Sequence, residues 1–308
     1  MPKLIQLQNV SKQIGKKKII YGLSFDVYEG EVFGFLGPNG AGKTTTIRMM
    51  VGLMNITEGD IIICGKSVKT NFEQALQHVG AIVENPELYP FLSGYKNLVH
   101  FARMSKNVSK EKINEVVQLV GLSDRIHDKV KNYSLGMRQR LGLAQCLLHD
   151  PKVLILDEPT NGLDPAGIRE IRDYVRKLAK EKRMAIIVSS HLLSEMEMMC
   201  DRIAIIQKGK LVGVQAVEEF VSDHQKTYRF EINLAPSLET IMQTNFPDYS
   251  FIIKDSYLEI KLEREQVPTI IRTLVEQGVH IYSVQPVKKS LEERFLEVTE
   301  KEGEVQHA

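Results

Sequence analysis

A glycine-rich segment near the start of this 308-residue chain has the residue types needed to bind a nucleoside triphosphate. Residues 37–45 have the sequence GPNGAGKTT, which fits the pattern G-x-x-x-x-G-K-[ST] in full. Gly40 and Gly42 let the backbone curl so that successive N–H groups point at one anion. Lys43 supplies a mobile positive charge for the β- and γ-phosphates, and the Thr44 hydroxyl is a hard oxygen ligand suited to Mg²⁺. The contacts with the nucleotide that we expect from this loop are Gly37, Pro38, Asn39, Gly40, Ala41, Gly42, Lys43, Thr44 and Thr45.

Two carboxylates follow a strand-like apolar run further along the chain. Residues 153–159 have the sequence VLILDEP, which places Asp157 and Glu158 at the end of that run. Ligands bind at the carboxyl ends of strands in parallel sheets. We therefore expect Asp157 to hold Mg²⁺ through water, and Glu158 to orient or deprotonate the water that attacks the γ-phosphate. Taken alone, the same residues could be a strand followed by a solvated acidic turn.

The elements around these segments predict an α/β core. Residues 32–36 form an almost wholly apolar run, typical of a strand buried on both faces, and residues 44–53 have helical spacing. A strand, a glycine loop and a helix are the context that a phosphate loop requires. Further apolar runs at 152–156 and 184–189 predict strands, with a helix from Pro165 between them. Strands that alternate with helices favour a parallel sheet.

Two other parts of the chain have a different character. Residues 85–150 are mainly helical in pattern and are expected to form a subdomain inserted into the core, so that the first domain spans 1–215. Residues 216–308 alternate short strand-like and helix-like segments, which predicts a small α+β domain with no recognisable chemistry. Its expected helices lie at 237–245, 267–277 and 290–299.

The composition narrows the classes of function. The net charge of +1 offers no global basic field that would favour nucleic acid as a partner. Apolar runs are only a few residues long, whereas a membrane-spanning helix needs about 20 residues. No signal-peptide pattern is visible at the N-terminus. We expect Cys64, Cys146 and Cys200 to be buried apolar residues in a reducing compartment rather than metal ligands or disulfides.

A third motif narrows the choice among the protein families that have a phosphate loop. Residues 133–137 have the sequence YSLGM and lie just upstream of the acidic pair. This segment resembles the signature motif of the ABC ATPases, in a variant common among drug- and peptide-exporting members. The resemblance spans roughly residues 4–215, and the C-terminal part is similar, with less specific motifs, to an accessory domain of bacitracin-resistance ATPases. It implies an α/β P-loop NTPase core of ABC type with an inserted helical subdomain, acting on ATP with Mg²⁺.

The resemblance also implies that each nucleotide site is shared by two chains. Ser134 and Gly136 would present a hydroxyl and a backbone N–H to the γ-phosphate of ATP held by a second copy. Asp164 ends a segment that resembles the loop crossing the dimer interface in this family, and His191 stands where the family keeps its switch histidine. A histidine without this framing would more often be an ordinary surface or core residue.

Two positions depart from the family pattern. The family usually stacks adenine on an aromatic side chain near the position of Ile14, so we expect looser binding of the base here. Glu84 stands where the family has a glutamine that contacts Mg²⁺ and links to the membrane partner. Glu84 could still supply an oxygen to Mg²⁺, or it could be a solvated loop carboxylate. Residues 84–97 are the candidate surface for docking a membrane subunit, although Tyr89 could instead pack in the core.

The expected function is therefore that of an ATP-hydrolysing subunit that powers export of a peptide antibiotic or drug through a separate transmembrane permease. It would act as a dimer of two copies, peripherally, at the cytoplasmic side of the membrane, without binding nucleic acid. The alternatives are an ABC importer ATPase and a soluble ABC ATPase acting on nucleic acid or ribosomes. A catalytically silent regulatory subunit is disfavoured because the expected site residues are intact, namely Lys43, Asp157, Glu158 and His191.

Overall fold

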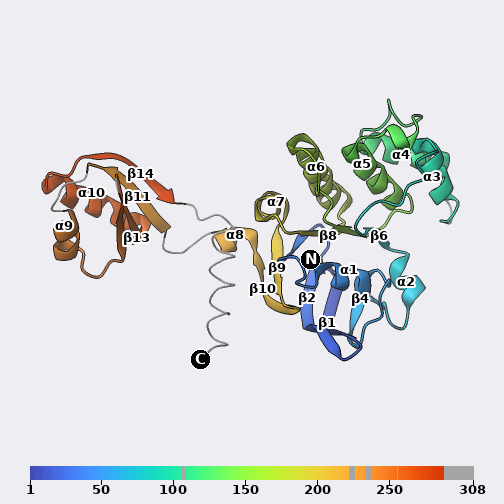
Figure 1. Cartoon of the computed structure of the whole chain (residues 1–308), viewed down its shortest axis with the longest axis horizontal. Coiled ribbons are helices and arrows are strands. Elements are labelled where there is room, and N and C mark those ends of the chain that lie inside the picture. The colour runs from blue at the N-terminus through green and yellow to red at the C-terminus, as the bar shows by residue number, and fades with distance from the viewer. Residues whose placement is uncertain (106–107, 222–225, 234–237, 255, 288–308) are drawn as a thin grey trace. The chain divides into compact units, whose positions relative to one another are not determined.

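The computed structural model describes residues 1–105, 108–221, 226–233, 238–254 and 256–287. The chain divides into two compact units, Met1–Val217 and Glu218–Ala308 (Figure 1). A short helix, α8 (Val217–Val221), begins at the junction.

The first unit is built on a six-stranded sheet with the order β10-β9-β3-β8-β7-β6. The strands from β9 to β6 are parallel to their neighbours, and only the edge strand β10 runs antiparallel. Because adjacent strands are parallel, their carboxyl ends lie at one edge of the sheet. The strands are β3 (Val32–Leu36), β6 (Val79–Ile82), β7 (Val153–Asp157), β8 (Ala185–Ser190), β9 (Arg202–Gln207) and β10 (Lys210–Ala216).

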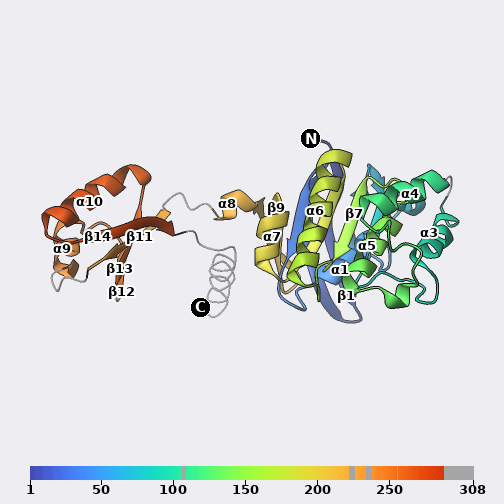
Figure 2. The same ribbon diagram turned by 90° about the horizontal axis from the view of Figure 1, so that it is seen from above.

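Both faces of this sheet are covered, which explains the apolar runs in the sequence. Phe33 and Ile155 pack into a core shared with the helix α1 (Lys43–Met50) and with a second sheet. On the opposite face, α6 (Pro165–Lys182) and α7 (Leu193–Met199) contact β3 and β8 (Figure 2). Each central strand is therefore buried on both sides. The predicted α/β core is confirmed.

The second sheet was not foreseen as a separate layer. It is antiparallel, has the order β2-β1-β4-β5, and packs its apolar side into the core shared with α1. Leu23, Phe25 and Val27 are buried as their alternation predicts, whereas Ser24 on the other side of β2 is exposed. The strands are β1 (Lys3–Ile14), β2 (Lys17–Tyr28), β4 (Glu58–Ile63) and β5 (Lys66–Ser67), with α2 (Phe72–Leu76) following β5.

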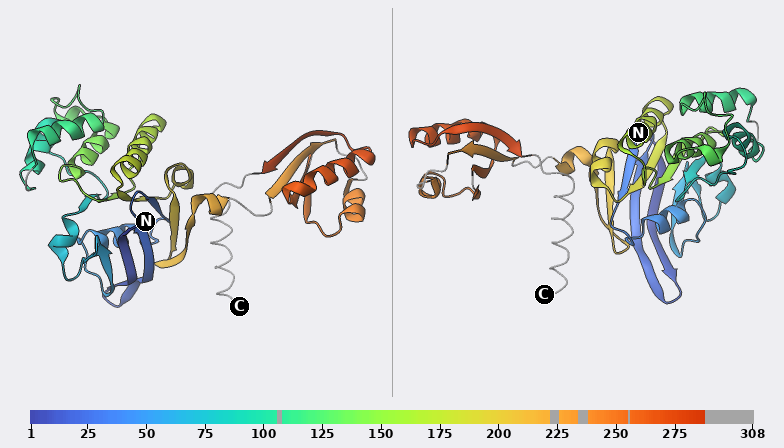
Figure 3. Two further views of the ribbon diagram at one scale, coloured as in Figure 1. Left: turned by 180° about the vertical axis from the view of Figure 1, so that it is seen from behind. Right: turned by 45° about the horizontal axis from the view of Figure 1, so that its top comes forward.

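Helices gather at one end of the first unit, between β6 and β7 in the chain (Figure 3). They are α3 (Gly94–Ala102), α4 (Lys110–Leu119), the short 3₁₀ helix Val130–Asn132 and α5 (Leu135–Cys146). Ile113, Val116 and Val117 are buried on one face of α4, as the spacing predicts. Cys146 in α5 is buried, and burial raises the pKa of its thiol to about 12. Cys200 is buried too, whereas Cys64 is only half-buried, so the expectation of burial is wrong for Cys64.

The second unit has the element order β-α-β-β-α-β around its own core. Its antiparallel sheet has the order β12-β13-β11-β14, the arrangement of ferredoxin-like domains. The elements are β11 (Lys226–Ile232), α9 (Leu238–Asn245), β12 (Phe251–Lys254), β13 (Tyr257–Leu262), the 3₁₀ turn Arg264–Gln266, α10 (Val267–Glu276) and β14 (Ile281–Val287). The helix predicted at 290–299 lies outside the described residues.

No helix within the described ranges is both long and apolar enough to cross a bilayer.

Candidate functional site

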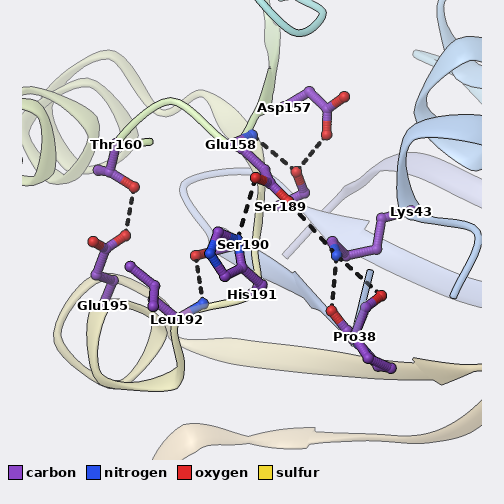
Figure 4. Close-up of polar contacts among 11 residues, drawn as sticks. Pro38, Lys43, Asp157, Glu158, Thr160, Ser189, Ser190, His191, Leu192 and Glu195 are labelled. Atoms are coloured by element: carbon purple, nitrogen blue, oxygen red, sulfur yellow. Dashed lines mark hydrogen bonds and ion pairs between the residues drawn. The ribbon is translucent and has the colours of Figure 1, made fainter. Parts of the chain in front are cut away.

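The parallel sheet brings the predicted chemical groups to one edge. The glycine loop follows β3, Asp157 ends β7 with Glu158 directly after it, and His191 follows β8. Asp157 lies directly across from Ser189 in the register of β7 and β8, and Leu36 lies across from Ser190. Segments more than a hundred residues apart in the chain therefore meet at the carboxyl edge, as Figure 4 shows.

The glycine loop has the backbone shape that an anion cradle requires. Gly40 and Gly42 have φ angles of 80° and 111°, in a region that other residues rarely adopt. Gly42 caps the start of α1 without any side-chain hydrogen bond to the first turn. The backbone N–H groups of that turn are thus available to an anion, and the helix dipole favours one there. The loop therefore fits a phosphate chain.

Lys43 is the central cation of this edge. Its side chain is 5% exposed, and its Nζ donates to the carbonyl of Gly37 at 2.7 Å. Nζ also lies 3.7 Å from Glu158 Oε1. Burial lowers the pKa of Lys43, although the carboxylates of Glu158 and Asp157 oppose that shift. The lysine is thus partly desolvated, so its charge acts strongly on a neighbouring anion.

The two carboxylates are held differently. Asp157 is buried, and its Oδ1 accepts a 2.6 Å hydrogen bond from the Ser189 hydroxyl. Ser189 Oγ also accepts from the backbone N–H of Glu158 at 2.9 Å. One hydroxyl on β8 therefore fixes both the buried carboxylate and the start of the turn that carries the second one.

Glu158 has a strained backbone and an accessible side chain. Its φ of 48° is unusual for a residue other than glycine, asparagine or aspartate. Strain of this kind persists only when the surrounding structure holds it, and it is common at functional sites. His191 Nδ1 lies 3.2 Å from Glu158 Oε2, so the histidine and Lys43 flank the same carboxylate. Glu158 is thus the partly exposed carboxylate of this edge, and it lies next to both Lys43 and His191.

Comparison with known proteins agrees with this geometry. The sequence profile described as "ABC transporter" matches residues 20–161. An uncharacterized ABC transporter ATP-binding protein of Bacillus subtilis, YhcH, is 63% identical over 100% of both chains. The chain belongs to the ABC transporter family. It is an ATP-binding subunit, and it hydrolyses ATP to power transport.

A further relative and a solved structure support the same family. The bacitracin transport ATP-binding protein BcrA of Bacillus licheniformis is 37% identical, covering 97% of this chain and 98% of the relative. A solved structure described as the ATP binding subunit of an ABC transporter superposes with a TM-score of 0.63 at 27% identity, covering 70% of this chain and 91% of that one.

The signature segment of this ABC subunit takes no part in the hydrogen bonds and ion pairs that the described residues form around Lys43. Ser134 is exposed at the start of α5, where its Oγ accepts from the N–H of Met137. Asp164 is likewise exposed and caps α6 through Gly167 N–H. In the described part of the chain, the hydrogen bonds of these two residues stay within their own turns. A Cβ on Gly136 would lie 3.8 Å from Leu163, so the two segments form one neighbouring surface.

Glu84 follows β6 at the same edge but is paired elsewhere. Its Oε1 accepts a 2.6 Å hydrogen bond from Arg48 on α1, and its backbone φ is 64°. The predicted role of Glu84 as a ligand of Mg²⁺ therefore requires the side chain to leave Arg48. Ile14, the other departure from the ABC pattern, is 53% exposed at the end of β1.

Replacing Ile14 by tyrosine is expected to tighten nucleotide binding. An aromatic face adds stacking to a base, which contributes on the order of 1–3 kcal/mol and corresponds to a roughly 5- to 150-fold lower Kd for ATP. The Kd can be measured by titration calorimetry. Ile14→Leu serves as the matched control, because it changes shape without adding an aromatic ring. An unchanged Kd in Ile14→Tyr would remove Ile14 from the nucleotide site.

Several polar residues at this edge of the sheet could not be assigned to the site from the sequence. Ser189, Thr160 and Glu195 look like ordinary polar residues in the sequence, and only the fold pairs them with the loops after β7 and β8. For Ser189 a signal existed, because it is a polar residue near the end of an otherwise apolar strand. For the Arg48 contact with Glu84, 36 residues away in sequence, none did.

Proposed function

We propose that this subunit hydrolyses Mg-ATP through Glu158 and delivers the resulting work to a separate export permease. The observation that carries the proposal is the position of the Glu158 carboxylate between Lys43 and His191 at the carboxyl edge of the sheet. A general base must lie beside both the phosphate cradle and the attacking water, and Glu158 is flanked by the phosphate-binding lysine.

The chemistry assigns a distinct task to each group. Lys43 and the N–H groups of the loop hold the β- and γ-phosphates. Glu158 orients a water molecule in line with the γ-phosphate and takes its proton as the new P–O bond forms and the bond to ADP breaks. His191 contacts the γ-phosphate and restrains the Glu158 carboxylate. Mg²⁺, when bound, neutralises phosphate charge, and the oxygens of Thr44, Asp157 and Glu84 suit this hard cation.

The second half of the site would come from another copy of the chain. Ser134 and Gly136 sit at the N-terminus of α5, which favours contact with an anion. They are not part of the cluster around Lys43, so within one chain they have no phosphate to bind. A head-to-tail pair of chains would place this surface, with Asp164 beside it, over the γ-phosphate of the partner chain.

The permease would dock next to Glu84. A pocket of about 450 Å³ lies there, lined in part by Arg48, Leu53, Glu84, Pro86 and Gly142. Leu53 and Phe91 are 68% and 65% exposed, and exposed apolar side chains suit a protein contact. Tyr89 packs edge-on against His100, while its backbone N–H donates to Asn97, so it is anchored rather than free. The contact would hold the subunit at the cytoplasmic side of the membrane.

A peptide antibiotic is the cargo class that the names of the relatives favour, and the direction proposed for its transport is export. BcrA of two species is named for bacitracin transport, and SrtF of Streptococcus pyogenes, 41% identical over 68% of this chain, is named for lantibiotic transport. The second unit belongs to this assignment as well, because BcrA matches 97% of the chain rather than the ATPase part alone.

The test is to express the chain in a bacitracin-sensitive host together with a candidate permease, namely a multi-spanning membrane protein from a neighbouring reading frame. We expect higher survival with the pair, no gain with Glu158→Gln, and loss of co-purification with Leu53→Asp. Val275→Asp, on an exposed position of α10, is the matched control and should keep both properties. Uptake that depends on an extracellular binding protein would instead make the chain an importer subunit.

A further inference from the structure

A buried hydrogen bond joins the turn that carries Glu158 to α7, the helix that follows His191. The hydroxyl of Thr160 donates to Glu195 Oε2, as Figure 4 shows. Thr160 lies two residues after Glu158, and Glu195 lies in the first turn of α7, just after the segment that carries His191. The two residues are only 4% and 5% exposed. The contact is therefore a fixed part of the interior.

Burying the carboxylate of Glu195 lowers the free energy of unfolding. Its second oxygen, Oε1, is shielded from solvent without a hydrogen-bond partner among the described residues. No lysine, arginine or histidine of the described chain forms an ion pair with it either. An uncompensated buried carboxylate lowers the stability of the fold. Among the described residues, the hydrogen bond from Thr160 is the polar contact of the Glu195 side chain.

The hydrogen bond between Thr160 and Glu195 lies at the turn that contains the strained backbone of Glu158. The turn after β7 begins with the strained φ of Glu158 and continues with Asn161 N–H donating to the Glu158 carbonyl at 3.1 Å. Ser189 holds the start of the turn by accepting from Glu158 N–H. Thr160 fixes the middle of the turn through its hydrogen bond to Glu195. The backbone around Glu158 is therefore held by Ser189 of β8 and by Glu195 of α7.

We propose that Thr160 and Glu195 form a positioning pair for ATP hydrolysis: they fix the turn that aims Glu158 at its water and tie it to the segment of His191. The proposal rests on the proposed role of Glu158 as general base. A displacement of about 1 Å in a reacting group can lower the rate by roughly 100-fold. A contact that fixes this turn therefore favours turnover, even though burying Glu195 lowers the stability of the fold.

Three substitutions in the full-length chain separate positioning from a structural role. Thr160→Val keeps the side-chain shape but removes the donor, and Thr160→Ser restores the hydroxyl. Glu195→Gln keeps an acceptor oxygen but removes the buried charge. For each variant, kcat and KM for ATP, the Kd for ATP and the Tm are measured.

Positioning predicts that Thr160→Val lowers kcat by roughly 10- to 100-fold with the Kd for ATP within about twofold of wild type. Thr160→Ser should recover kcat to within about threefold. Glu195→Gln should raise the Tm, because a buried uncompensated charge is lost, and yet lower kcat several-fold. Turnover and stability then move in opposite directions, which a merely structural pair would not produce.

Two results would overturn the proposal: wild-type kcat in Thr160→Val, or a kcat that follows the Tm through all three variants. If Thr160→Val does not fold, the opposite movement of Tm and kcat in Glu195→Gln still decides. Glu158→Gln is measured in parallel. Wild-type turnover in Glu158→Gln would refute the general-base role itself, whereas low turnover there with wild-type turnover in Thr160→Val would refute only the positioning pair.

Discussion

Replacing Glu158 by glutamine is expected to lower ATP turnover by about two to four orders of magnitude while ATP binding is retained. The amide has the shape of the carboxylate but cannot take a proton from the attacking water. Lys43 and the phosphate loop stay in place, since Lys43 Nζ is also bonded to the Gly37 carbonyl at 2.7 Å. Phosphate release and the Kd for ATP should be measured on the same preparation.

A matched variant controls for this prediction. Glu197→Gln changes a second carboxylate of the same region, on the exposed side of α7, and should leave turnover unchanged. If Glu158→Gln hydrolysed ATP as fast as the wild type, another group would have to be the base, and the geometry around His191 would need a different explanation.

Removing the charge of Lys43 should also have a large effect, on the affinity for ATP rather than on the rate of the hydrolysis step. In Lys43→Ala the carboxylates of Asp157 and Glu158 would face the phosphates without the buried cation that balances them. A hydrogen bond to a charged group contributes about 1.5–3 kcal/mol, so the Kd for ATP should rise roughly 10- to 100-fold. Titration calorimetry measures it.

The control for Lys43→Ala is Lys180→Ala, which removes an exposed lysine from α6. It should bind ATP like the wild type, because a solvent-screened charge far from the ligand contributes little. Equal ATP affinity in Lys43→Ala and the wild type would contradict the phosphate role of Lys43.

Much of the core could be predicted from local pattern. The wholly apolar segments before Gly37 and Asp157 identified buried parallel strands, and a parallel sheet necessarily gathers its strand ends at one edge. The alternation of Leu23, Phe25 and Val27 is typical of a half-buried strand, but it does not indicate that this strand belongs to a second, antiparallel sheet. Strand pairing depends on tertiary packing, which a single-strand pattern does not encode.

The side-chain partners within the site were beyond the sequence for the same reason. Arg48 and Glu84 meet because β6 ends beside α1, and Thr160 meets Glu195 because the turn after β7 lies against α7. Neither contact leaves a periodic or compositional trace. The strained φ of Glu158 was equally invisible, since a glutamate in the sequence gives no sign of a left-handed backbone.

The most direct test of the account is whether ATP brings two chains together. The Glu158→Gln chain should be monomeric without nucleotide and should have twice that mass with Mg-ATP, as measured by light scattering after gel filtration. Adding Ser134→Arg to it should abolish the dimer while the Kd for ATP changes little, because Ser134 lies outside the phosphate cradle of its own chain. A Glu158→Gln chain that binds ATP but stays monomeric at high concentration would contradict the shared site.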